Sequence, residues 1–249
     1  MGKISLYGLG HRICDIASKL QQRRVSRKLV ASEWERVLQG PFRGMRMKVD
    51  PTRSGFLPML IGTYELELRD WIEEAVRWKP SLVLNVGAAS GYYAVGMALR
   101  LPNAKVVAFE MDPGEAAKCR DAARENRVEH LVEVRGKCEA GTFSDMTLAR
   151  AMVISDCEGA EVDVFTDDVV RMLRNSWILL ELHDALRPGC SREMYSRFRN
   201  SHTCRFVSAL PRNVEDLDLP PHLSLRDQNT AVFENRLGVQ EWALMTPRT

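Results

Sequence analysis

Hydrophobic and polar positions follow one pattern before about residue 80 and another after it. In the first part, apolar residues recur at helical spacing over 11–39 and over 64–78, and the glycine- and proline-rich stretch 40–62 predicts a long loop. In the second part, short apolar runs rich in β-branched residues alternate with helical patterns. The predicted strands cover 81–86, 104–109, 131–134, 151–155, 177–182, 204–210 and 241–245, with helices at 91–100, 113–126, 160–173 and 190–200.

This alternation predicts an α/β fold, doubly wound, with a mostly parallel seven-stranded, Rossmann-like sheet. We expect two parts, a basic helical N-terminal extension with its loop (1–62) and the sheet domain (63–249). Parallel strands end at one edge of such a sheet, and ligands bind there. A polar stretch at 216–229 is long enough to cover a substrate, or it is a loop without a role.

The composition is that of an ordinary globular protein and shows no sign of a membrane or secreted protein. The 249 residues are 45% hydrophobic and 27% charged, which is ordinary for a globular protein. No apolar run approaches the ~18 residues of a membrane span, and no secretory signal is apparent, so we expect a cytoplasmic protein. The six cysteines lack zinc-site spacing, and free thiols in a reducing compartment are the simpler interpretation.

The charge is unevenly distributed. Residues 1–53 hold 12 Lys and Arg against 4 Asp and Glu, while the remainder holds 23 against 29. A basic arm could meet nucleic acid or a membrane surface, or it could be the solvated face of a helix docked on the body. The scarcity of aromatic residues among these charges favours the docked helix.

The turn after the first sheet-domain strand carries small residues, Gly87-Ala88-Ala89-Ser90-Gly91. Small residues let the backbone turn sharply and let a ligand approach, and the next helix points its free N–H groups there. Glu110, about twenty residues on, ends the second strand, where a carboxylate can accept hydrogen bonds from a ribose diol. The plainer alternative is a strand–turn–helix in which the glycines only permit packing.

The turn from Asn85 to Gly91 resembles motif I of class I S-adenosylmethionine-dependent methyltransferases, and with Tyr92-Tyr93 it is similar to the "VGA-x-x-GYY" form of their FkbM-like branch. Four further segments, in matching order, are similar to that branch: Gly62-Thr63-Tyr64-Glu65, Glu110-Met111-Asp112-Pro113, Asp156-Cys157-Glu158-Gly159-Ala160-Glu161 and Glu181-Leu182-His183. The resemblance covers about residues 60–185. Departures from the pattern are Asn85 for an acid, Ala89 for the second glycine, Ile154 for a lysine and Cys157 for valine.

The resemblance implies S-adenosyl-L-methionine as the cofactor. It assigns cofactor contacts to Tyr64, Glu65, Asn85, Gly87, Ala88, Ala89, Gly91, Tyr92, Glu110, Met111, Cys138 and Asp156. For Tyr64 and Glu65 the alternative is that the tyrosine packs and the glutamate caps a helix. NAD fits less well, because Ala89 replaces the second glycine of the dinucleotide fingerprint.

Transfer to a hydroxyl needs a general base or a metal ion. The candidate catalytic residues are Asp156, Glu158, Glu181 and His183, at the ends of the fourth and fifth strands. Alternation places Glu181 and His183 on one face, and a histidine with a near-neutral pKa is a natural base, although a local hydrogen-bond network would explain it as well. The four residues could also hold a divalent cation, but their spacing is not diagnostic and we expect no metal. For Glu161 we expect only a favourable position in the first turn of a helix.

The sequence therefore predicts a methyltransferase that acts on the hydroxyl of a small molecule, a sugar or a natural product. The alternatives are a nucleic-acid methyltransferase that uses the basic arm to hold phosphates, and a non-catalytic binding protein of the same fold.

Overall fold

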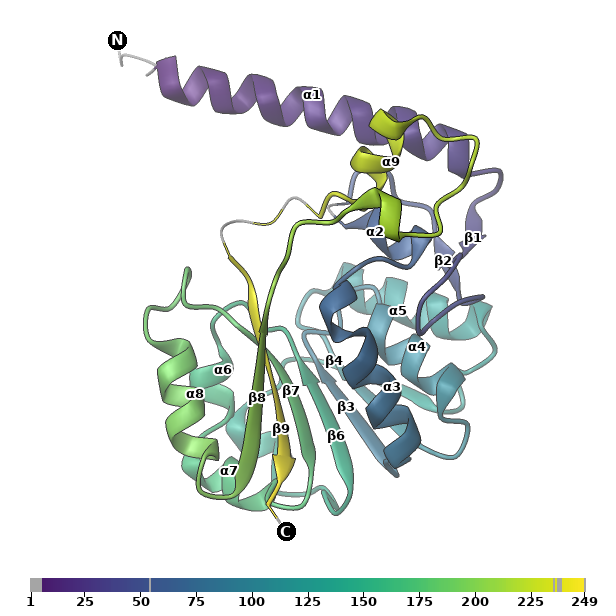
Figure 1. Cartoon of the computed structure of the whole chain (residues 1–249). Helices are drawn as coiled ribbons and strands as arrows, with labels where there is room; N and C mark the ends of the chain where they lie inside the picture. The colour runs from purple at the N-terminus through teal and green to yellow at the C-terminus, as the bar shows by residue number, and fades with distance from the viewer. Residues whose placement is uncertain (1–5, 54, 235, 237–238, 249) are drawn as a thin grey trace.

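The computed structural model describes residues 6–248 except 54, 235, 237 and 238 (Figure 1). Its centre is a seven-stranded sheet of order β5-β4-β3-β6-β7-β9-β8. The first five strands in this order are parallel, and β9 runs antiparallel to both β7 and β8. The strands are β3 (Leu82–Val86), β4 (Lys105–Phe109), β5 (Val132–Arg135), β6 (Ala151–Ser155), β7 (Trp177–Leu182), β8 (His202–Ser208) and β9 (Glu241–Pro247). The predicted fold class is confirmed, and all seven strands lie within a few residues of the predicted ranges.

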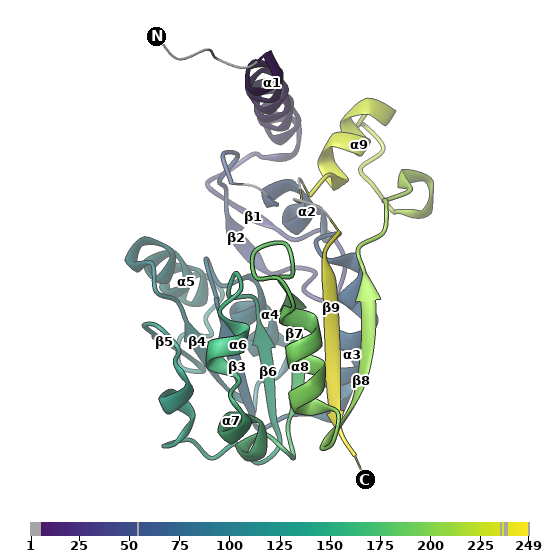
Figure 2. The same cartoon turned by 90° about the vertical axis from the view of Figure 1, so that its left-hand side faces the viewer.

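Helices cover both faces of this sheet (Figure 2). One face packs against α3 (Arg69–Trp78), α4 (Tyr92–Arg100) and α5 (Pro113–Glu125), and the other against α6 (Glu161–Val164), α7 (Asp167–Met172) and α8 (Cys190–Phe198). Neighbouring strand residues serve opposite faces, since Val83 belongs to the first core and Leu84 to the second. The single helix predicted over 160–173 is wrong: Thr166 accepts the Val169 N–H and caps a new helix there.

The N-terminal part differs from its prediction. Helix α1 (Leu6–Leu29) ends ten residues before the predicted end, and the short strands β1 (Trp34–Arg36) and β2 (Arg46–Lys48) then pair antiparallel. The predicted loop 40–62 also contains the helix α2 (Phe56–Ile61). The carboxylate of Glu35 accepts the N–H groups of Ala31 and Ser32, which supports the turn out of α1. Helical spacing misled here because the hairpin is defined by a partner strand ten residues away.

The segment between β8 and β9 packs onto this N-terminal part. It contains η3 (Val214–Asp216) and α9 (Leu225–Val232), so the predicted loop 216–229 is partly helical. Apolar residues of both parts form a third core: Val25, Phe56, Leu57, Leu60, Ile61, Val214, Leu219, Leu223, Ala231 and Val232. Lys28 on α1 pairs with the buried Asp227 on α9 at 2.5 Å. Figure 1 shows α1 and α2 beside α9, above the carboxyl edge of the sheet. The division at residue 62 stays a prediction, since the extension shares a core with this later segment.

No helix among the described residues is long and apolar enough to cross a bilayer.

Candidate active site

The turn after β3 is held against the ends of both neighbouring strands. Gly87 has φ +75°, and a Cβ at this position would lie 1.7 Å from the carbonyl oxygen of Asp156. The N–H groups of Gly87 and Ala88 both donate to the carbonyl of Phe109, at 3.0 and 2.9 Å. Gly91, with φ +90°, begins α4, where a Cβ would lie 2.7 Å from the sulfur of Cys119. Glycine is therefore required twice by close approach as well as by backbone conformation.

Glu110 closes this turn from the end of β4. Its carboxylate accepts the N–H of Ala89 at 2.7 Å and the N–H of Asp112 at 2.8 Å. These bonds fix the half-buried carboxylate beside the turn, as expected for a diol-binding residue. Met111 follows with an exposed side chain.

Two other residues assigned to the cofactor, Asn85 and Cys138, have side chains buried within the protein. Asn85 is buried within β3, and its amide donates to the carbonyl of Ile154 on β6 at 3.3 Å. Cys138 packs in the core on the α6–α8 face, and burial raises the pKa of its thiol to about 11. Their roles as cofactor contacts stay predictions, and the structure gives both of them packing roles.

A pocket of about 280 Å³, here called the edge pocket, opens at the carboxyl ends of β6 and β7. The four candidate catalytic residues all line it, together with Gly55, Tyr64, Leu182, Ala185, Leu186, Glu234, Arg236, Val239 and Gln240. The structure thus brings together side chains from four separate stretches of the sequence. Glu181 and His183 share a face as predicted, with Glu181 Oε1 3.9 Å from His183 Nε2.

His183 is buried at the centre of this group. Its Nδ1 lies 2.8 Å from Glu161 Oε1, and its Nε2 lies 3.3 Å from Asp156 Oδ1 and 3.7 Å from Glu158 Oε2. Burial alone would lower the pKa of His183, but the hydrogen bonds with Asp156 and Glu161 outweigh it and raise the pKa to about 10. The expectation of a near-neutral histidine is therefore wrong. At neutral pH His183 is an imidazolium that donates hydrogen bonds.

Glu161 has a larger role than its predicted position in a helix turn. It does begin α6, but its side chain is fully buried and also accepts the N–H of Cys157 at 3.1 Å. Burial would raise the pKa of this carboxyl, yet the contact with His183 holds the pKa below its usual value. No local pattern indicates this pair, because 22 residues separate its members.

Two buried glutamates, Glu65 and Glu181, also lie close to Asp156. Burial, reinforced by the charge of Asp156, raises the pKa of Glu181 to about 9. Burial also raises the pKa of Glu65 to about 7, although Arg236 opposes the shift. Glu65 accepts a short hydrogen bond from the hydroxyl of Tyr93. Glu65 precedes the short helix Leu66–Leu68, but its side chain makes no cap hydrogen bond there and lies close to Asp156 and Glu181 instead.

Arg236 is not among the residues predicted for the site, because no local pattern points to it. Its guanidinium lies 3.4 Å from Glu65, 3.5 Å from Glu181 and 2.9 Å from Glu234, and it stacks over the ring of Trp242 at 4.7 Å. It comes from the connection to β9, far along the chain from Glu65 and Glu181. Only the antiparallel insertion of β9 beside β7 places it there.

The acidic group has the donor atoms of a cation site. One ligand atom from each of Asp156, Glu158 and His183 lies within 4.8 Å of the others, and the same holds for Glu65, Asp156 and Glu181. Oxygen-rich groups with one imidazole suit divalent cations. The expectation of a metal-free site stays a prediction.

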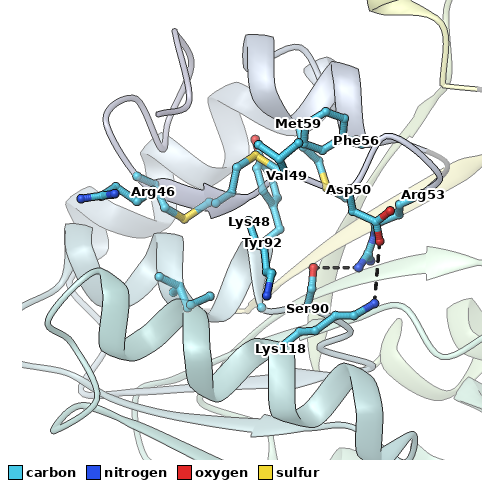
Figure 3. Close-up of a pocket in the computed structure, with 15 residues that line it drawn as sticks. Arg46, Lys48, Val49, Asp50, Arg53, Phe56, Met59, Ser90, Tyr92 and Lys118 are labelled. Atoms are coloured by element: carbon cyan, nitrogen blue, oxygen red, sulfur yellow. Dashed lines mark hydrogen bonds and ion pairs between the residues drawn. The ribbon is translucent and has the colours of Figure 1, made fainter. Parts of the chain in front are cut away.

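A second pocket of about 150 Å³, here called the hairpin pocket, lies between the β1–β2 hairpin, α2 and the helices α4 and α5 (Figure 3). Arg53 crosses its mouth, donating to the hydroxyl of Ser90 at 2.7 Å and to Glu115 at 2.8 Å. The N-terminal extension is thereby tied to the turn that precedes α4.

No family model and no curated protein matches the sequence. Solved structures do match the fold. A putative O-methyltransferase from Klebsiella pneumoniae is 12% identical, with a TM-score of 0.51 over 94% of this chain and 89% of that chain. The fold is the Rossmann-like fold of methyltransferases. Cofactor-bound Rv0187 from MTB has 15% identity and a TM-score of 0.54, over 76% of this chain and 82% of its own. The METTL16 MTase domain has 10% identity and a TM-score of 0.53, over 83% of this chain and 75% of its own.

Proposed function

We propose that this protein is an S-adenosylmethionine-dependent methyltransferase of the FkbM-like branch, acting in the cytoplasm on a hydroxyl group of a small molecule, a sugar or a natural product. The observation that carries the proposal is the position of Asp156. Its carbonyl contacts the Gly87 turn and its side chain lines the edge pocket, so it joins the proposed cofactor site to the proposed acceptor site.

The residues present suit this cofactor. Glu110 offers a carboxylate fixed by two backbone N–H groups beside the turn, where its remaining lone pairs can accept from a ribose diol. Asp156 and Glu158 both line the pocket, and their carboxylates favour a cationic ligand there. When bound, S-adenosylmethionine supplies an electrophilic methyl group on a sulfonium.

The side chains of the edge pocket then have distinct tasks. Asp156 is partly exposed and can accept the proton of an acceptor hydroxyl. His183 donates toward Asp156 and is itself held by Glu161, so the pair orients the carboxylate. Glu158 is exposed at the mouth and can contact the acceptor. Arg236 limits the charge that Glu65 and Glu181 bring to the pocket.

The cofactor assignment is tested by isothermal titration with S-adenosylmethionine, S-adenosylhomocysteine and NAD. We expect micromolar binding of both sulfur ligands, at least about tenfold weaker in Glu110→Ala and unchanged in the control Glu129→Ala, an exposed glutamate. Binding of NAD alone, or of none of the three, would overturn the proposal. Melting temperatures of both variants check that the turn remains folded without the Glu110 carboxylate.

The chemistry is tested by mass spectrometry of products from a panel of hydroxyl compounds. In Asp156→Asn we expect turnover at saturating S-adenosylmethionine to fall by about 10²–10⁴-fold, the usual contribution of a general base. Full activity of this variant would remove Asp156 from the chemistry.

A further inference from the structure

The hairpin pocket is separate from the edge pocket. The two share no lining residue, and the chain between them contributes Arg53 and Phe56 to one and Gly55 to the other. Figure 3 shows Val49, Phe56 and Met59 at the top of the pocket, with Arg46 at the left, and Asp50, Arg53 and Lys118 toward the right. Of its lining, only Gly91 and Tyr92 are among the residues assigned to the cofactor, and the proposed methyl transfer uses none of the methionines there.

The inner wall is apolar and adaptable. Met45, Phe56, Met59 and Val95 are almost fully buried there, and Met47, Val49, Tyr92 and Ala122 complete the lining. Methionine side chains adjust to irregular ligands and favour aromatic rings. An apolar cavity of about 150 Å³ is large enough for a benzene ring.

The charges around the mouth cancel. Four cationic residues line it and each has a carboxylate partner: Arg46 with Glu125 at 2.8 Å, Lys48 with Glu33 at 3.1 Å, Arg53 with Glu115 at 2.8 Å, and Lys118 with Glu115 at 2.6 Å and Asp50 at 3.8 Å. Four acids thus balance four bases. A charged ligand would bury its charge without a partner or break one of these pairs.

The hydroxyl of Ser90 lines the pocket next to the side chain of Arg53. The oxygen of Ser90 accepts from Arg53, so its O–H is left to donate. A ligand that places a hydrogen-bond acceptor at its outer end can therefore bind this hydroxyl.

We propose that the hairpin pocket binds a small uncharged aromatic or alkyl molecule, with its apolar body among the methionines and a single ether or carbonyl oxygen toward Ser90. This site is additional to the proposed methyl-transfer site, and its test does not depend on cofactor binding.

The test uses protein labelled with ¹³C at the methionine methyl groups. The sequence has 11 methionines, of which Met45, Met47 and Met59 line the pocket and are assigned by single Met→Leu variants. Three probes of similar size are titrated: anisole, benzoate and benzylamine. We expect anisole to shift these three methyl signals saturably, and the charged probes to bind at least about tenfold more weakly.

Matched variants on α5 locate the binding. Ala122→Leu fills the pocket and is expected to weaken anisole binding at least about tenfold, while Ala117→Leu on the exposed side of the same helix leaves it unchanged. Met47→Phe fills the pocket from the opposite wall and replaces Ala122→Leu if that variant does not fold. No saturable shift with anisole, equal binding of either charged probe, or unweakened binding in a folded filled variant would each overturn the proposal.

Discussion

Replacing Glu181 by glutamine should stabilise the protein, and more so as the pH rises. Burial raises the pKa of Glu181 from 4.5 to about 9, so its carboxyl keeps a proton in the folded state while it ionises in the unfolded chain. Above pH 4.5 this ionisation favours the unfolded chain. The free energy of unfolding therefore falls as the pH rises, until the pH reaches the pKa of Glu181 in the folded protein. Glutamine has nearly the same shape as the protonated carboxyl and cannot ionise.

The size of the effect follows from the interval between pH 4.5 and pH 7. At about 1.4 kcal/mol per pH unit this interval corresponds to about 3 kcal/mol. The amide of glutamine must replace the carboxyl as acceptor of the Arg236 N–H at 3.5 Å, and any loss in this hydrogen bond works in the opposite direction. We therefore expect Glu181→Gln to gain about 1–3 kcal/mol at pH 7, as is common when a strained active site is relieved.

Urea unfolding of the wild type and the variant at pH 5, 6, 7 and 8 measures this difference. We expect it to grow steadily across the series. Glu241→Gln, at an exposed position on the adjacent β9, is the control for the effect of replacing a glutamate by glutamine without burial. A difference that is constant between pH 5 and pH 8, or a variant less stable than the wild type at pH 8, would show that Glu181 is ionised in the folded protein and refute the reasoning.

Three further predictions test other contacts. Gly87→Ala should destabilise the protein by more than about 2 kcal/mol, because its Cβ would overlap a carbonyl oxygen at 1.7 Å, whereas Gly136→Ala, with no atom within 4 Å, should be tolerated; equal melting temperatures would contradict this. Arg212→Met should cost about 3–5 kcal/mol in urea unfolding, since it removes the cation paired with the buried side chain of Glu67 and leaves Glu234 paired with Arg236; a loss below about 1 kcal/mol would mean that water replaces it. In Glu161→Gln the pKa of His183 should fall from about 10, which a ¹⁵N histidine NMR titration can follow; an unchanged value would assign the shift to Asp156 alone.

The elements predicted from the sequence agree best with the structure in the middle of the chain, where the pattern of apolar residues matches the burial of each strand. The strands β3, β4, β6 and β7 are buried on both faces, so each reads as a short apolar run that no helix pattern imitates. The turn at Gly87 and the acid at Glu110 follow from the same alternation, because a parallel sheet must present its strand ends at one edge. From these patterns the fold class, the edge that carries the pocket and its four candidate catalytic residues could be predicted.

Other features depend on partners that are distant in the sequence. The hairpin of β1 and β2, the packing of α9 on α1, and the pair between Glu161 and His183 each join segments that no local period relates. Arg236 enters the acidic group only because β9 inserts between β7 and β8. The protonation states of His183, Glu181 and Glu65 also depend on residues that are distant in the sequence. A pKa reflects burial and neighbouring charges, and both exist only once the chain has folded.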